Sequence, residues 1–205
     1  MTRAIVLGVL AFCAAIPASG QTKGRVSVGG TVTLAQPTDK DVKSVVTFGP
    51  LVRLNPRKGW GLAGGLSWFE ADLANPSGGS EPFATLRVRP LLGGVAYTVG
   101  EQPLLISFSI VAGPSFNHLE FQDDFLDRLP TGATRPSVDI NTSLVVRPGI
   151  GLTWTVAQRA AIIAFGGYSI NRPSITYRDT TGQEFHNRWK ADALLFSVGA
   201  VYSLF

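Results

Sequence analysis

Cysteine and charge are both scarce in this chain of 205 residues. It contains one cysteine, Cys13, and charged residues make up only 16% of the sequence. A single thiol cannot form a disulfide within the chain, so stability must come from hydrogen bonding and packing. After the first twenty residues there is no run of eighteen uncharged apolar residues, which excludes a transmembrane helix of ordinary length in that part of the chain. The net charge of +4 is scattered, and no basic run predicts nucleic-acid binding.

The start of the chain has the pattern of a secretory signal peptide. Arg3 forms the positive n-region, and the apolar run Ala4–Ile16 follows it. This run is too short for a comfortable membrane span, and small residues before Gln21 predict cleavage at that point. We therefore expect residues 1–20 to be a signal peptide and residues 21–205 to form a single domain.

Glycine, proline and aromatic residues are abundant, with 23 Gly, 13 Pro, 12 Phe and 4 Trp. This composition suits an all-β chain that has many turns and an apolar surface. Apolar residues alternate with small or polar residues through eight segments, with the period of two that is typical of β-strands. The eight expected strands cover approximately residues 25–35, 45–54, 60–71, 83–99, 104–119, 142–154, 160–177 and 191–205.

The alternation is clearest in the last segment, Ala191–Phe205. Larger residues such as Leu194 and Phe196 share one face, whereas smaller residues such as Ser197 and Gly199 share the other. A strand at the end of a chain needs neighbours for its backbone N–H and C=O groups. Pairing with the first strand would supply one neighbour and would close the sheet into a barrel without an edge.

The connections between the expected strands alternate in length. Short turns occupy residues 55–59, 100–103 and 155–159, and the other four connections are long and polar. Eight alternating strands with short turns at one end and long loops at the other are the sequence signature of a transmembrane β-barrel.

The two faces of the expected barrel differ in chemistry. The face opposite the large apolar residues is rich in Gly, Ser and Thr, and it is expected to form a polar lumen while the apolar face meets lipid. A soluble lipocalin-like barrel with its apolar face inward and a β-sandwich are the alternative folds. Arginines in the lumen could pair with acids from the loops or hold an anion. The basic residues expected to face the lumen are Arg53, Arg87, Arg89 and Arg147.

Aromatic residues gather near both ends of the expected strands. Trp and Tyr prefer the two interfaces of a membrane, where an amphipathic ring is half hydrated. The aromatic residues expected at these interfaces are Trp60, Trp68, Tyr97, Trp154, Tyr177, Trp189 and Tyr202.

The signal peptide, the eight alternating segments, the Gly-rich face and the terminal Phe205 resemble the small eight-stranded bacterial outer-membrane barrels of the OmpA/OmpX type. The resemblance extends from about Arg25 to Phe205. It implies an eight-stranded antiparallel up-and-down transmembrane β-barrel in the outer membrane, with short periplasmic turns and long extracellular loops. It also implies that the barrel-assembly machinery reads Phe205 as an insertion signal, and that outer-membrane lipid surrounds a monomeric barrel.

Some barrels that this chain resembles modify acyl chains of lipid A, and the deacylases among them use a His, a Ser and an acid. His118, Glu120 and Ser115 come nearest to that set, but alternation places Ser115 on the other face and the adjoining His-x-Ser pattern is absent. We therefore expect no catalytic residues. The acidic loop residues Asp123, Asp124 and Asp127 lack a calcium-ligand spacing, and no metal or cofactor is expected.

An eight-stranded barrel fills its interior with side chains, which argues against an open pore. The sequence thus predicts a non-enzymatic outer-membrane protein with a structural or surface-interaction role, although no loop carries a recognisable binding motif. An enzyme that modifies acyl chains of lipid A or phospholipid, and a narrow channel or carrier for small molecules, are the alternatives.

Overall fold

The computed structural model describes residues 26–38, 44–55, 57–73, 84–121, 137–178 and 183–204. The predicted signal peptide (residues 1–20) and the terminal Phe205 lie outside these residues. The acidic loop residues Asp123, Asp124 and Asp127 also lie outside them. None of the described residues belongs to a helix that is long and apolar enough to cross a membrane.

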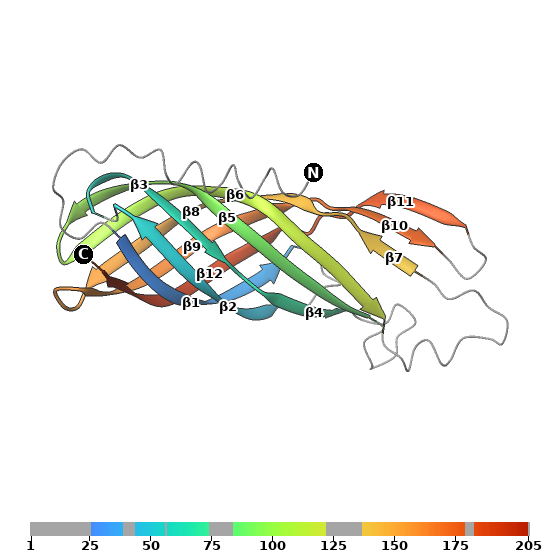
Figure 1. The fold of residues 1–205 in the computed structure, drawn as a ribbon, viewed down its shortest axis with the longest axis horizontal. Coiled ribbons are helices and arrows are strands. Elements are labelled where there is room, and N and C mark those ends of the chain that lie inside the picture. The colour runs from blue at the N-terminus through green and yellow to red at the C-terminus, as the bar shows by residue number, and fades with distance from the viewer. Residues whose placement is uncertain are drawn as a thin grey trace.

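The described parts of the chain form twelve β-strands, shown in Figure 1. Nine of these strands build an eight-stranded barrel, because β3 and β4 follow one another along the same edge of β5 and count as one barrel strand. The barrel strands are β1 (Val26–Pro37), β2 (Val45–Leu54), β3 (Gly59–Leu66), β4 (Phe69–Leu73), β5 (Ala84–Glu101), β6 (Leu104–Phe121), β8 (Ser143–Thr155), β9 (Ala160–Asn171) and β12 (Ala193–Ser203). The three remaining strands are β7 (Ser137–Ile140), β10 (Ser174–Arg178) and β11 (Glu184–Arg188).

The first and last strands lie side by side and close the barrel. β1 pairs antiparallel with β12 from Ser27 opposite Ser203 to Pro37 opposite Ala193, and it pairs with β2 on its other side. β3 pairs with both β2 and β5, so the sheet order returns to its starting point. The predicted closed eight-stranded antiparallel up-and-down barrel is confirmed.

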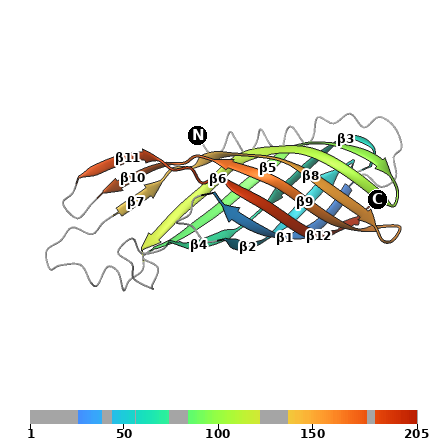
Figure 2. The same cartoon turned by 180° about the vertical axis from the view of Figure 1, so that it is seen from behind.

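Two expected strands are interrupted. The third is split between β3 and β4 at Ser67 and Trp68, and the seventh is split between β9 and β10 at Arg172 and Pro173. Proline has no N–H for the ladder, which accounts for a break at Pro173. Beyond that break β10 pairs with β7 and β11 in a small sheet outside the barrel rim, as Figures 1 and 2 show.

β7 and β11 lie in two of the connections that were expected to be long polar loops, residues 120–141 and 178–188. The expectation that these connections contain no strand is wrong. Both strands are short, and their side chains do not show a long alternating pattern. Every residue of β11 is exposed, so the sequence contains no buried face that would reveal this strand. Their formation depends instead on β10, which offers both of its edges to them.

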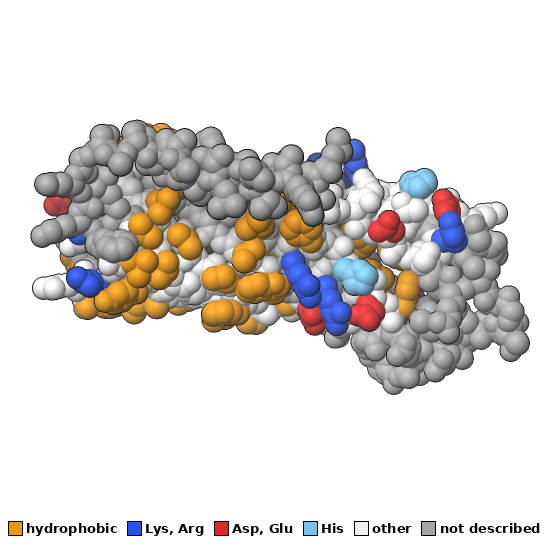
Figure 3. All heavy atoms as spheres, in the orientation of Figure 1, with side chains coloured by type: hydrophobic (Ala, Val, Ile, Leu, Met, Phe, Trp, Pro, Cys, Tyr) orange, Lys and Arg blue, Asp and Glu red, His pale blue; other side chains and the backbone are white. Residues whose placement is uncertain are grey.

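Large apolar side chains cover the outside of the barrel between its ends. Val198 is 62% exposed and Ile110 is 56% exposed, and Figure 3 shows apolar side chains spread over the visible face of the barrel. The inside carries small polar side chains such as Ser107 and Thr153, together with smaller numbers of apolar ones such as Leu195, and all three of these residues are buried. This is the reverse of a soluble lipocalin-like barrel, and it gives the barrel an outer surface that suits lipid.

Candidate functional site

The lumen is divided into three spaces. A central cavity of about 170 Å³ lies between the two ends of the barrel. A vestibule of about 440 Å³ opens at the short-turn end, and a space of only about 60 Å³ lies on the long-loop side of the cavity. The space inside the barrel is therefore uneven in size along the barrel.

Arg53 on β2 lies between the central cavity and the vestibule, because its side chain lines both. It is 8% exposed, and its guanidinium crosses the lumen to the opposite wall. Nη1 donates to Oγ1 of Thr153 on β8 at 2.9 Å, and Nη2 donates to Oγ of Ser107 on β6 at 3.1 Å. One arginine thus links three strands across the interior.

Arg147 on β8 occupies the corresponding place at the other end of the central cavity. Its side chain lines both the cavity and the small space on the long-loop side. Nε donates to Oγ of Ser169 and Nη1 donates to Oγ of Ser67, each at 3.3 Å. Among the described residues, no carboxylate forms an ion pair with Arg147 or Arg53.

Glycines on β8 and β9 make room for an aromatic ring inside the lumen. Phe165 lines the central cavity. A Cβ atom at Gly167 would lie 2.7 Å from the Phe165 ring, and a Cβ at Gly149 would also collide with it. The ring therefore lies where only glycine fits beside it. Together with Leu92, Ile163 and Leu195 it makes much of the cavity wall apolar.

An apolar cluster closes the lumen above Arg147. Leu86 and Val88 on β5 are 1% and 2% exposed, and they pack with Ile140 on β7. Four partly buried residues pack against this cluster, namely Leu119, Val138, Ile175 and Trp189. We call these seven residues the plug. Because β7 and β10 contribute to it, the small sheet beyond the rim is joined to the barrel by a common core.

The prediction that Arg87 and Arg89 face the lumen is wrong. Both lie on the outer face of β5, and Leu86 and Val88 face inward instead. β5 has 18 residues, whereas a membrane-spanning strand needs about 9–11. We call the outward-facing apolar side chains around Val198 and Ile110 the apolar belt. The upper part of β5 extends past this belt, where an apolar interior and a charged exterior are the normal arrangement in water.

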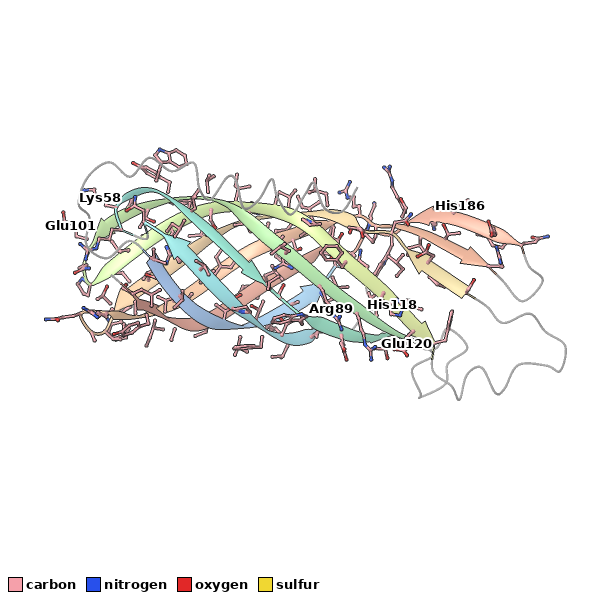
Figure 4. The ribbon with its side chains drawn as sticks, in the orientation of Figure 1. Lys58, Arg89, Glu101, His118, Glu120 and His186 are labelled. Carbon is pink, nitrogen blue, oxygen red and sulfur yellow. The ribbon has the colours of Figure 1, made fainter. Side chains whose placement is uncertain are left out.

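Arg87 holds two carboxylates on this outer surface. Its Nε lies 3.0 Å from Oε1 of Glu70, and its Nη1 lies 2.8 Å from Oε2 of Glu120. Arg89 and His118 point outward beside this group, as Figure 4 shows. Figure 3 shows the charged cluster where the apolar belt ends.

Four aromatic residues named from the sequence lie on the outer face near the short turns. Trp60 and Tyr97 contact one another across β3 and β5, with ring centroids 5.1 Å apart. Trp154 and Tyr202 are also about half exposed. Trp68 is 46% exposed toward the other end of the barrel.

The two remaining aromatic residues expected at the membrane interfaces are Trp189 and Tyr177. Trp189 packs into the plug, so its expected position at the lipid interface is wrong. Its place after β11, where the chain turns back over the barrel mouth, accounts for the difference. The side chain of Tyr177 lies outside the described residues.

The side chains considered for acyl chemistry do not come together. His118 and Glu120 lie on the outer face of β6, whereas Ser115 is fully buried on the inner face. The hydroxyl of Ser115 donates to Oδ1 of Asn117 at 2.8 Å. In the described parts of the chain, no group of three or more His, Cys, Asp or Glu side chains is placed to hold a metal ion.

Sequence reasoning missed the hydroxyl partners of the lumen arginines and the carboxylate of Asp192. Asp192 is 6% exposed, and its Oδ1 accepts a hydrogen bond from the backbone N–H of Asn171 at 3.0 Å. Alternation could place Ser107 and Thr153 on the inner face. It could not show that both meet Arg53, because strand order and stagger decide which residues meet across a lumen.

No protein-family model and no curated protein sequence matches this chain. Solved structures do match its fold over most of its length. The outer membrane protein OprG from Pseudomonas aeruginosa is 11% identical with a TM-score of 0.71, covering 89% of this chain and 97% of that one. The E. coli outer membrane protein W is 12% identical with a TM-score of 0.55, covering 90% and 100%. A major outer membrane protein from Thermus thermophilus is 11% identical with a TM-score of 0.56, covering 86% and 98%. The chain thus has the fold of the small eight-stranded bacterial outer-membrane barrels.

Proposed function

We propose that this protein is a non-conducting barrel of the bacterial outer membrane, with a structural or surface-interaction role exercised at its long-loop end. The observation that carries this proposal is the plug, which fills the lumen above Arg147 with apolar side chains. A narrow constriction lined in part by apolar side chains opposes the passage of ions. The apolar outer surface of the barrel supports the location in a membrane.

The sheet of β7, β10 and β11 supports a role at the long-loop end. It stands beyond the rim of the barrel in Figure 1, and every residue of β11 is exposed. Thr176 Oγ1 lies 3.0 Å from Nδ1 of His186, and Arg178 pairs with Glu184. Phe185 is 50% exposed on the opposite face of β11. The short-turn end offers much less surface, since tight turns close its strands.

The proposal includes the biogenesis that the sequence implies. Residues 1–20 would direct export, and Phe205 would be recognised by the barrel-assembly machinery. The mature barrel would be surrounded by outer-membrane lipid as a monomer. No catalytic role is assigned to His118, because its expected serine partner faces the lumen.

Conductance in planar lipid bilayers tests the non-conducting character. The wild-type barrel should give no conductance steps, whereas Leu86→Gly combined with Val88→Gly should open the lumen and produce them. Leu91→Ala, which faces outward on the same strand, is the matched control and should stay silent. Steps typical of a water-filled pore from the wild-type barrel would contradict the proposal and favour the channel alternative.

A shortened chain tests the role of the outer sheet. Asn171 and Ala191 are joined by a backbone hydrogen bond of 2.9 Å, so a two-residue turn can replace residues 172–190. Loss of cell adhesion to charged beads, with detergent resistance unchanged, would support surface interaction. Loss of detergent resistance alone would support a structural role. If neither property changes while the shortened barrel remains folded, this part of the proposal is wrong.

A further inference from the structure

Two arginines, the buried Arg53 and the half-buried Arg147, face one cavity in the lumen, and neither has a carboxylate partner among the described residues. Arg53 and Arg147 both line the central cavity, and hydroxyl groups are their hydrogen-bond partners. We propose that this cavity is a binding site for one small oxyanion, such as phosphate, sulfate or a short carboxylate. This inference is independent of the role proposed for the outer sheet.

The charge of the two arginines is the first reason. A guanidinium stays protonated in proteins, so burial cannot be relieved by loss of a proton. A buried charge is costly unless it is paired with an opposite charge. The hydroxyls of Ser107, Thr153, Ser169 and Ser67 are neutral and supply no such charge. An anion in the cavity would supply it.

Hydrogen-bonding capacity is the second reason. A guanidinium carries five N–H groups, and each of these two arginines donates to two hydroxyls. Within the described parts of the chain, each guanidinium therefore has further N–H groups for a ligand. Arginine binds oxyanions well because two parallel N–H donors match two oxygen acceptors. The hydroxyl of Ser109 on the cavity wall can add a further donor.

The size of the cavity limits the ligand. A volume of about 170 Å³ holds several waters, because one water needs only about 10–15 Å³ of such space. This is enough for a tetrahedral oxyanion with a few waters. It is too small for a nucleotide or a lipid headgroup with its acyl chains. Phe165 and Leu92 occupy part of the wall and further restrict the space.

The route into the cavity is the third reason. The vestibule at the short-turn end is lined by Arg57 and Arg159 as well as Arg53. A mouth lined by positive charge raises the local concentration of anions. On the other side of the cavity the plug closes the lumen. The site is therefore a pocket with a basic entrance at the short-turn end.

Equilibrium dialysis of the full barrel in detergent micelles tests the proposal. Radiolabelled phosphate is the probe, with potassium chloride holding the ionic strength constant. Sulfate and acetate compete in separate arms and distinguish tetrahedral from planar oxyanions. The expected result is saturable uptake of one phosphate per barrel. Absence of saturable uptake above the chloride background would overturn the proposal.

Substitutions then locate the bound anion. Arg53→Met and Arg147→Met should each weaken phosphate binding by about tenfold or more, as expected for loss of a charge-assisted hydrogen bond. Arg89→Met removes an outward-facing arginine and should leave binding unchanged. Mobility on unboiled gels verifies that each variant is folded. Folded Arg53 and Arg147 variants that bind phosphate like the wild type would overturn the proposal.

A cavity-filling variant covers the case in which neither arginine can be removed without unfolding. Gly151 lines the cavity, and a Cβ atom there would have its nearest neighbour at 3.6 Å. Gly151→Val therefore fills space while both arginines stay in place. Weaker phosphate binding by this variant supports the cavity site, and unchanged binding overturns it.

Discussion

The hydroxyl of Thr33 on the first strand lies 2.7 Å from the hydroxyl of Ser197 on the last strand, although 164 residues separate them in sequence. A second hydroxyl pair, Ser27 and Ser203, lies 3.1 Å apart on the same seam. Both pairs face the lumen, where small polar side chains allow the two strands to meet. The first and last strands of the barrel are therefore joined by side-chain hydroxyls as well as by backbone hydrogen bonds.

Gly199 should be essential at this seam. A Cβ there would collide with the backbone oxygen of Gly30 and lie 2.8 Å from Cγ2 of Thr31. Because backbone cannot move aside easily, Gly199→Ala should lower the free energy of unfolding by about 1–3 kcal/mol. Denaturant titration followed by tryptophan fluorescence measures this change. The control is Gly166→Ala, where a Cβ meets nothing within 4 Å and the change should stay within about 0.5 kcal/mol. Equal effects of both variants would contradict the prediction.

The free-energy cost of placing a charged side chain on the outer surface should depend on its position along the barrel. Val198 is 62% exposed on β12 within the belt, whereas Arg89 already lies where the belt ends. In lipid vesicles, Val198→Arg should cost about 2–4 kcal/mol of folding free energy, as expected for an arginine near the bilayer midplane. Arg89→Leu should cost little. A Val198→Arg barrel that folds into vesicles as stably as the wild type would argue against lipid contact at this face.

The barrel could be predicted from the sequence because its strands carry a period of two at nearly every position. The inner and outer faces of β12 follow directly from Leu194, Phe196 and their alternate neighbours. The same rule failed on β5, where Arg87 and Arg89 were assigned to the lumen because they are polar. Unbroken alternation along β5 puts Arg89 on the same face as Tyr97, eight residues later. Because Tyr97 was expected to face outward, alternation alone would have placed Arg89 on the outer face as well. Polarity misled the assignment because β5 leaves the membrane before it ends.

The candidate site was predicted less completely than the barrel. Arg53 and Arg147 were named from alternation, and each lies inside. The plug and the hydroxyl partners depend on contacts between strands far apart in sequence, and alternation carries no information about such contacts. β11 was missed because a fully exposed strand has no buried face to produce a pattern.

The pair of Arg178 and Glu184 should make the outer sheet sensitive to acid. The hydrogen bond from Arg178 and its positive charge lower the pKa of the Glu184 carboxyl, and nearby His186 lowers it further. A carboxyl with a lowered pKa in the folded state contributes stability above its ordinary pKa, and this contribution is lost as the pH falls through the lowered value. Amide hydrogen exchange in β10 and β11 should therefore be faster at about pH 3 than near neutrality, beyond the intrinsic effect of pH.

A titration of the Glu184 carboxyl by NMR checks the cause of this acid sensitivity. Arg178→Gln should raise the pKa of Glu184 toward its ordinary value and remove most of the acid sensitivity of the hairpin. Arg188→Gln changes the same charge at the other end of β11 and serves as the control. An unchanged pKa of Glu184 in Arg178→Gln would show that this ion pair does not form in solution.

The long-loop end should face the outside of the cell, and single cysteines can test this orientation. Cys13 is the only cysteine and lies in the predicted signal peptide, so the mature chain offers a background without thiols. Phe185→Cys on β11 should react with a membrane-impermeant maleimide on intact cells, because the side chain at this position is half exposed. Gln158→Cys, on an exposed short turn, should react only after the outer membrane is permeabilised. The opposite labelling pattern would place the basic vestibule of Arg57 and Arg159 outside the cell, and anions would then enter the lumen from the medium and not from the periplasm.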